Sequence, residues 1–469
     1  MGDMKLYAAD LNFDSVAEEF DINRGFPPEL VAEAREARDV YAQDRVDARE
    51  IPLVTVDPQG SKDLDQAVYI ATRGEDFEVF YAIADVGAFV RPGSGLYAEA
   101  LRRGQTVYLP DCPARLYPPE LSEGSASLLP GVDRPAVLWH VTVDSVGDVR
   151  SAEARRATVR SRAQLTYTGP SHPSIALLPR LGAARRASSL RRRAVNLSLP
   201  DTRVTRLVDG KFELELEPRN RRMDDNSEIS LMTGLIAGHM MAEAGCGYLR
   251  TLQPAPPEAL DAFATEMSHL GFSFTPNKEL PAEFSGGVGP FLASVDATTP
   301  RGMVAHKEAA KLLRGADYRF LEHDAPVVHA GVGGMYSHVT APLRRLVDRY
   351  ASEYCLALCA GREPESWAHD DAEQVVDTMR RTSQLAGTVD NACVRLTEAT
   401  VLAPWVGTTF TALVLSTNEE KNKAKISLKD PPIISTDLLG SPAEGEETLV
   451  SLVTAKPETR TIDFAWPAD

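Results

Sequence analysis

Residues 57–70 read DPQGSKDLDQAVYI and follow directly on the apolar, β-branched run 51–56, IPLVTV. Such a run is typical of a buried strand, so Asp57, Asp63 and Asp65 lie at a strand end and in the loop beyond it. Asp63 and Asp65 are two positions apart and project from the same face of an extended chain. Carboxylates crowded in this way repel one another unless water or a divalent cation lies between them.

The spacing of these aspartates leaves two interpretations open. A solvated turn, with Asp side chains bonded to nearby backbone, is the commoner origin of such a pattern. The alternative is a magnesium site, because Mg²⁺ prefers oxygen ligands and keeps water or substrate phosphates in its other positions. An EF-hand calcium loop is disfavoured, since the spacing differs and no Glu closes a twelve-residue loop.

Strand and helix patterns alternate through the middle of the chain. The β-branched and aromatic runs at 77–86 and 136–145 predict strands. The stretches 228–244, 340–358 and 370–385 predict helices. The expected fold is therefore an α+β body with a mixed sheet.

The two ends of the chain have different textures. Residues 1–48 predict a short helical N-terminal element, in which Pro27 and Pro28 open a helix. Residues 398–469 alternate β-rich runs with polar turns and predict an all-β barrel of the OB type. The predicted domains are 1–48, a catalytic body at 49–397, and the barrel.

Composition limits the class of protein. The formal net charge of −17 argues against general nucleic-acid binding, so an RNA-binding surface would need local positive charge, as at 155–162 or 344–349. The five cysteines include no Cys-x-x-Cys, which disfavours disulfide frameworks and zinc ribbons. We expect a cytoplasmic protein without a membrane segment, because no apolar run and no signal sequence stand out. Nothing in the sequence indicates an obligate protein partner.

The stretch at 57–70 resembles the signature of the catalytic RNB domain of the ribonuclease II family, in which Asp precedes Asp-x-Asp-Asp in this spacing. The likeness continues in order from about residue 27 to 400, which makes it far more specific than one motif. The further matching segments are IAD at 83–85, TVYLP at 106–110, LYPPELSE at 116–123, QLTY at 164–167 and YSHVTAPLRR at 336–345.

The resemblance implies a 3′-5′ exoribonuclease acting in RNA degradation or processing. Its implied substrate is single-stranded RNA, and its implied products are nucleoside 5′-monophosphates. The implied cofactor is Mg²⁺, as one or two ions, with Mn²⁺ as the alternative.

The resemblance also implies roles for particular residues. Asp57, Asp63 and Asp65 fall on the acidic positions that hold the metal, and Asp63 and Asp65 also support catalysis. Arg344 falls on the arginine that clamps the scissile phosphate, and Tyr167 on the tyrosine beside it. The implied RNA-binding residues are Tyr108, which stacks on bases near the 3′ end, Leu199, His338, Arg345, Lys421 and Lys423.

The residues themselves bear on these roles. Thr340 is a candidate helix N-cap and Pro342 a first-turn residue, which would place Arg344 in the first turns of a helix. A guanidinium there can fork onto phosphate oxygens, and Asp348 could orient Arg344 or Arg345. Without the family, Arg344 and Arg345 could be a surface pair, and the tyrosines would be packing residues.

This chain departs from the family at several positions. Gln66 replaces the fourth acidic residue, and its carbonyl could ligate a metal only without charge. Leu199 replaces the second aromatic of the base clamp, and Gly387 a downstream glutamate. About 45 residues precede the strand that ends at Asp57, so we expect the usual N-terminal cold-shock domains to be lacking. Tolerance of structured RNA is the resulting hypothesis.

Two other functions stay open. The first is a catalytically weakened or inactive RNA-binding protein that retains the fold, which the loss of charge at Gln66 supports. The second is an endonuclease, or a phosphohydrolase acting on small molecules, that uses the same aspartates.

Overall fold

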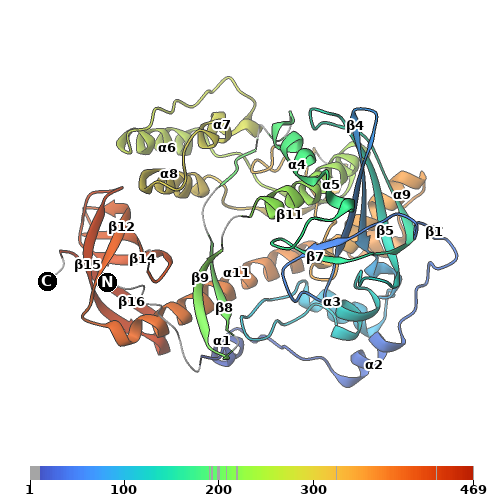
Figure 1. Ribbon diagram of the computed structural model, residues 1–469, viewed down its shortest axis with the longest axis horizontal. Helices are drawn as coiled ribbons and strands as arrows, with labels where there is room; N and C mark the ends of the chain where they lie inside the picture. The colour runs from blue at the N-terminus through green and yellow to red at the C-terminus, as the bar shows by residue number, and fades with distance from the viewer. Residues whose placement is uncertain are drawn as a thin grey trace.

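The computed structural model of the chain describes residues 11–467 except 190, 192–193, 198–200, 208, 218–219, 324 and 429. Figure 1 shows a large body built on a twisted sheet and a smaller barrel, with the long helix α11 (Ala372–Leu402) running between them. The N-terminal part of α11 packs beside α3 and α9, and its last residues contribute to the core of the barrel.

The sheet of the body has five strands in the order β1-β6-β5-β4-β3. Neighbours pair antiparallel except β1 and β6, which are parallel, so the sheet is mixed as predicted. The strands are β1 (Val46–Asp47), β6 (Val149–Arg160), β5 (Asp133–Val143), β4 (Asp76–Ala84) and β3 (Gln66–Arg73).

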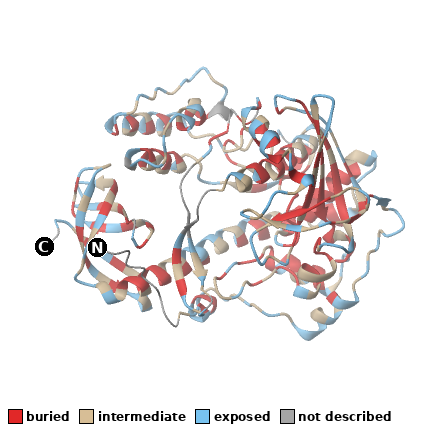
Figure 2. Cartoon of the chain, viewed as in Figure 1, coloured by how far each residue is buried: buried red, intermediate tan, exposed pale blue. Residues whose placement is uncertain are grey.

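Helices α5 (Arg221–Ala244), α9 (Leu346–Ala360) and α3 (Gly95–Arg103) enclose the main core together with the sheet. Figure 2 shows the strands of the sheet as mostly buried. Trp139 of β5 and Tyr81 of β4 are almost fully enclosed, and burying side chains of this size supplies much of the stability of such a core.

The C-terminal strands form a closed five-stranded barrel in the order β12-β13-β14-β16-β15. The barrel and the mixed-sheet body confirm the expected fold class. The barrel strands are β12 (Thr409–Asn418), β13 (Lys423–Leu428), β14 (Ile433–Leu439), β16 (Thr461–Ala465) and β15 (Glu447–Lys456).

Two further segments pack next to the barrel (Figure 1). The helices α6 (Pro257–His269), α7 (Val288–Ala293) and α8 (Pro300–Lys311) share a hydrophobic cluster with β12. The hairpin of β8 (Asp201–Arg206) and β9 (Phe212–Glu217) packs along α11. Other elements are α1 (Asp14–Glu19), α2 (Pro28–Glu36), β2 (Thr55–Asp57), β7 (Gln164–Thr166), α4 (Leu178–Ala187), β10 (Cys246–Thr251), β11 (Asp317–Glu322) and α10 (Ser366–Asp370).

The N-terminal segment packs against the hairpin and α11. Phe13 is fully buried and meets Phe212 of β9 edge to face, with ring centroids 5.3 Å apart. The same cluster includes Val107 and Leu109, which flank Tyr108 in the sequence. Within the described residues, no helix is both long and apolar enough to cross a membrane.

An acidic pair joins α6 to the barrel, and we expect it to make stability depend on pH. Burial, with a hydrogen bond to Glu444, raises the pKa of Glu266 to about 7. A carboxyl with a raised folded-state pKa stabilises the protein fully below its unfolded pKa of about 4.3, and this contribution is lost as pH rises through the folded pKa. Glu266→Gln should therefore shrink the fall in melting temperature between pH 5 and pH 8.

The matched control is Glu258→Gln, at an exposed position of the same helix. That variant should follow the wild-type curve. Identical pH profiles for the wild type and Glu266→Gln would contradict the assignment to this pair.

Candidate active site

Asp57 is the last residue of β2, which pairs in parallel with β7 so that Asp57 lies opposite Thr166. This pairing carries Tyr167, the residue after β7, to the same end of the strands. The Oδ2 atom of Asp57 is buried and has no hydrogen-bond partner. Burial, reinforced by the charge of Asp63, raises the pKa of Asp57 to about 6.

The loop that carries Asp63 and Asp65 is fixed by backbone contacts on both sides. Ser127 accepts the N–H of Leu64 and donates to the carbonyl of Lys62. The carbonyl of Asp65 accepts the N–H of Ala84, so Asp65 leads directly into β3. Both carboxyls therefore lie on a loop that is fixed by hydrogen bonds, not on a free, solvated turn.

Asp65 is the most enclosed of the three aspartates, with 6% of its surface exposed. Its Oδ1 accepts the backbone N–H of Leu343 at 2.8 Å, and its Oδ2 lies 3.6 Å from Nε of Arg344. Burial raises the pKa of Asp65 to about 8 although Arg344 acts against the shift. Burial also raises the pKa of Asp63.

The helix expected from residue 340 begins later, at Leu346, so the prediction that Thr340 caps it was wrong. The reason is that tertiary partners take up the backbone of this segment. Asp348 accepts the N–H of Ala341, Asp65 accepts that of Leu343, and the carbonyl of Arg344 accepts the N–H of Thr106. Residues 340–345, here called the arginine loop, therefore form turns and not helix.

The two arginines of this loop differ in their surroundings. The side chain of Arg344 is 44% exposed and faces Asp65, so its remaining donors are open to solvent. Arg345 instead donates through Nε and Nη2 to the fully buried Asp348, at 3.0 and 2.9 Å. Asp348 orients Arg345 and the loop backbone, whereas Arg344 is held by Asp65.

The predicted aromatic residues lie around this group. Tyr108 is 50% exposed and lies between the buried Val107 and Leu109. Burial raises the pKa of its hydroxyl, and the nearby charges of Arg344 and Asp63 also act on it. Tyr167 is half-buried against the main core. Both can present a ring surface beside the aspartates.

Other predicted RNA-binding residues lie elsewhere or in packed positions. The Nδ1 atom of His338 lies 2.8 Å from the hydroxyl of Tyr318, and burial lowers the pKa of the imidazole. Lys421 and Lys423 are exposed on the barrel. Leu199 lies outside the described residues. These RNA contacts stay predictions.

The side chain of Gln66 is engaged in hydrogen bonds. Its Oε1 accepts the hydroxyl of Tyr81 at 2.5 Å, and its Nε2 donates to the carbonyl of Thr340 at 2.7 Å. The hydroxyls of Ser230, on α5, and Thr340 share a further hydrogen bond of 2.7 Å. Sequence reasoning did not find Tyr81 or Ser230, because nothing in their local pattern separates them from core residues.

The side chains around Asp57 and Asp65 suit a magnesium ion in part. In the described part of the chain, no three His, Cys, Asp or Glu side chains come close enough together to form a metal-binding group. The carboxyls still suit a cation, since Asp57 has an orphaned buried oxygen and burial disfavours the charge on Asp65. Mg²⁺ commonly takes one or two protein carboxylates and completes its shell with water and phosphate.

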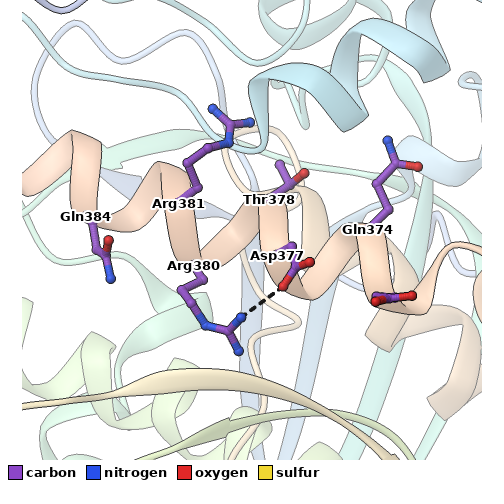
Figure 3. Close-up of a pocket in the computed structure, with 7 residues that line it drawn as sticks. Gln374, Asp377, Thr378, Arg380, Arg381 and Gln384 are labelled. Carbon is purple, nitrogen blue, oxygen red and sulfur yellow. Dashed lines mark hydrogen bonds and ion pairs between the residues drawn. The ribbon is translucent and has the colours of Figure 1, made fainter.

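A polar hollow of about 620 Å³ lies along α11. Figure 3 shows Arg380 bonded to Asp377, with Arg381 and Gln384 on the same helix. The hollow contains none of the predicted catalytic residues. Elsewhere on α11, the carbonyl of Thr382 accepts the side-chain amide of Gln105, whose backbone forms a β-bridge with Arg345 of the arginine loop.

The RNB domain family matches residues 45–358 of the 469. The chain belongs to the RNB domain family. This RNB-family chain is 28% identical over 353 residues to ribonuclease R of Vibrio cholerae, a match that covers 69% of the chain and 41% of that relative. The matched part is thus about two fifths of the length of the relative.

Solved structures share the fold of this RNB-family chain. Ribonuclease R of Mycoplasma genitalium in complex with ribose-methylated single-stranded RNA aligns with a TM-score of 0.86 and 16% identity, over 97% of this chain and 77% of that one. The same protein in complex with double-stranded RNA gives 0.84 and 18%, over 97% and 82%. Yeast Ssd1, described as a pseudonuclease, gives 0.70 and 14%, over 91% and 55%.

The pair of Arg345 and Asp348 should be a main support of the arginine loop. Asp348→Ala would leave the guanidinium without its partner and Ala341 without an acceptor. Breaking a buried pair from one side costs about 3–5 kcal/mol, and the low end applies because Arg345 keeps some contact with water. Urea unfolding followed by tryptophan fluorescence measures the loss.

The control Asp377→Ala removes an exposed carboxylate whose side chain is 65% accessible and should cost far less. The double variant Arg345→Met, Asp348→Ala should recover part of the stability. A loss below about 1 kcal/mol for Asp348→Ala would show that the pair is not a main support.

Proposed function

We propose that this chain is a 3′-5′ exoribonuclease that hydrolyses single-stranded RNA to nucleoside 5′-monophosphates with the help of Mg²⁺. The observation that carries the proposal is the contact between the buried Asp65 and the half-exposed Arg344. Membership of the RNB family supports it, and the family resemblance supplies the direction of attack and the products.

Each residue of the site has a task that its environment suits. Arg344 has free donors that can fork onto the phosphate at the scissile bond. Asp57 and Asp65, with Asp63 beside them, would hold the cation. When bound, Mg²⁺ would supply charge stabilisation and activate water for phosphoryl chemistry.

The aromatic residues suit an RNA end of any sequence. The exposed ring of Tyr108 can stack on a base, and stacking tolerates sequence because every base has a π-face. Tyr167 follows the last residue of β7, close to Asp57, and would position the phosphate. Such tolerance is what an enzyme that shortens RNA step by step requires.

Asp65→Asn tests the reaction with little effect on the fold, since the amide keeps an acceptor for Leu343. With 5′-labelled single-stranded RNA and Mg²⁺, the wild type should release mononucleotides and leave a shrinking labelled chain. The variant should lose about 10²-fold or more in rate, because metal-assisted charge stabilisation is worth several kcal/mol. Asp377→Asn, on the exposed face of α11, should keep the wild-type rate.

The same assay separates the rival functions. Binding of RNA without release of mononucleotides by the wild type, in Mg²⁺ or Mn²⁺, would favour an inactive RNA-binding protein, as the description of Ssd1 as a pseudonuclease illustrates. Internal fragments from circular RNA would favour an endonuclease.

We also propose that structured RNA is a substrate, which the likeness to a ribonuclease R solved with double-stranded RNA supports. A hairpin with a single-stranded 3′ extension should be shortened into its stem, with the product end mapped on a sequencing gel. An unpaired RNA of the same length is the control. A halt several nucleotides before the stem would contradict this proposal.

A further inference from the structure

Gln66 occupies a position between two walls of the site. It is the first residue of β3, next in sequence to Asp65. Its amide spans from Tyr81 on the neighbouring strand β4 to Thr340, which is 274 residues away along the chain. Tyr81 is 1% exposed and Thr340 is 3% exposed, whereas Gln66 is partly buried, so both hydrogen bonds are part-buried.

The chemistry of the two partners explains why this position holds an amide. The hydroxyl of Tyr81 donates, so it needs an acceptor, and the carbonyl of Thr340 accepts, so it needs a donor. A glutamine offers one of each. An ionised carboxylate has acceptors only and would direct its charge at the lone pairs of the Thr340 carbonyl.

Thr340 begins the arginine loop, and the loop is held at two points from neighbouring residues. Gln66 binds the carbonyl of Thr340, and Asp65 binds the N–H of Leu343 three residues later. These two contacts come from consecutive residues, Asp65 just before β3 and Gln66 at its start, and β3 pairs with β4 in the sheet. The spacing between these two hydrogen bonds sets the position of the next residue, Arg344.

We propose that Gln66 is a positioning residue that acts with Asp65 to place Arg344 over the aspartates, and that its amide is not a metal ligand. Both ends of the amide are already used within the protein, so its orientation is fixed by Tyr81 and Thr340. The inference rests on the proposed function only in that Arg344 binds RNA phosphate.

The test separates RNA binding from metal binding. Gln66→Leu removes both hydrogen bonds, whereas Gln66→Glu keeps the acceptor for Tyr81 and loses the donor to Thr340. Affinity for a short single-stranded RNA is measured in EDTA by fluorescence anisotropy, and affinity for Mn²⁺ alone is measured by electron paramagnetic resonance. Both variants should weaken RNA binding about five- to tenfold, on the scale of a lost hydrogen bond. Gln66→Leu, which adds no charge beside Asp65, should also change Mn²⁺ affinity less than about twofold.

A second measurement shows whether the effect passes through Arg344. In an Arg344→Ala background, Gln66→Leu should weaken RNA binding no further, because the group that it positions is gone. A general structural defect would persist in that background. Gln59→Leu makes the same substitution at an exposed glutamine of the preceding loop and should change neither affinity.

Two outcomes overturn the proposal. A fall of about tenfold in Mn²⁺ affinity, or the loss of one bound ion, with RNA binding in EDTA unchanged would make Gln66 a metal ligand. Unchanged RNA binding in both variants would remove the positioning role as well. Since binding in EDTA needs no hydrolysis, a wild type that cuts no RNA would end the proposed function but would leave this test intact.

Discussion

The contact between Asp65 and the arginine loop connects the two halves of the site. One carboxyl receives the N–H of Leu343 and faces the guanidinium of Arg344, joining segments 278 residues apart. Burial would favour a neutral acid here, and one arginine at 3.6 Å is too distant to offset the loss of hydration. The acid is kept in a position where its charge is costly without a cation, which is a feature of functional sites more than of structural ion pairs.

The same constraint explains how an acidic chain can form a site for a polyanion. The arginine-rich stretches are largely used inside the protein: Arg156 lies between Asp85 and Glu353, and Arg345 is paired with Asp348. The charges of these two arginines are therefore balanced within the protein and add little to a positive surface. Arg344 keeps open donors because its nearest acid, Asp65, is bound mainly to backbone.

The sequence predicts those parts of the protein whose signal is local or whose motif order resembles a family. Strands flanking Asp57, the mixed sheet and the C-terminal barrel are confirmed because alternation and turn residues specify them. The helix start near Thr340 was predicted wrongly, since Asp65, Thr106 and Asp348 compete for the backbone that a helix would use. Partners so distant in the chain leave no periodic pattern.

The hairpin β8–β9 likewise depends on contacts with segments that are distant in the chain. Its residue Phe212 is buried by Phe13 and α11, so the packing that holds the hairpin comes from distant segments. The hydrogen bonds of Gln66 are another case. Its departure from the family motif is visible in the sequence, but its partners at Tyr81 and Thr340 appear only in three dimensions.

The departure at Gln66 is the main sequence argument for an inactive protein, and the geometry weakens it. A fold alone does not carry activity, and a structural neighbour described as a pseudonuclease shares this fold. The decision therefore depends on the groups that face one another. Asp57 and Asp65 keep their buried oxygens and Arg344 keeps its donors, whereas Gln66 bonds to Tyr81 and Thr340 and stabilises the loop that presents the arginine. Loss of a charge at this position thus removes no partner from the arginine and leaves its supporting loop bonded, which favours a working site over an inactive relic.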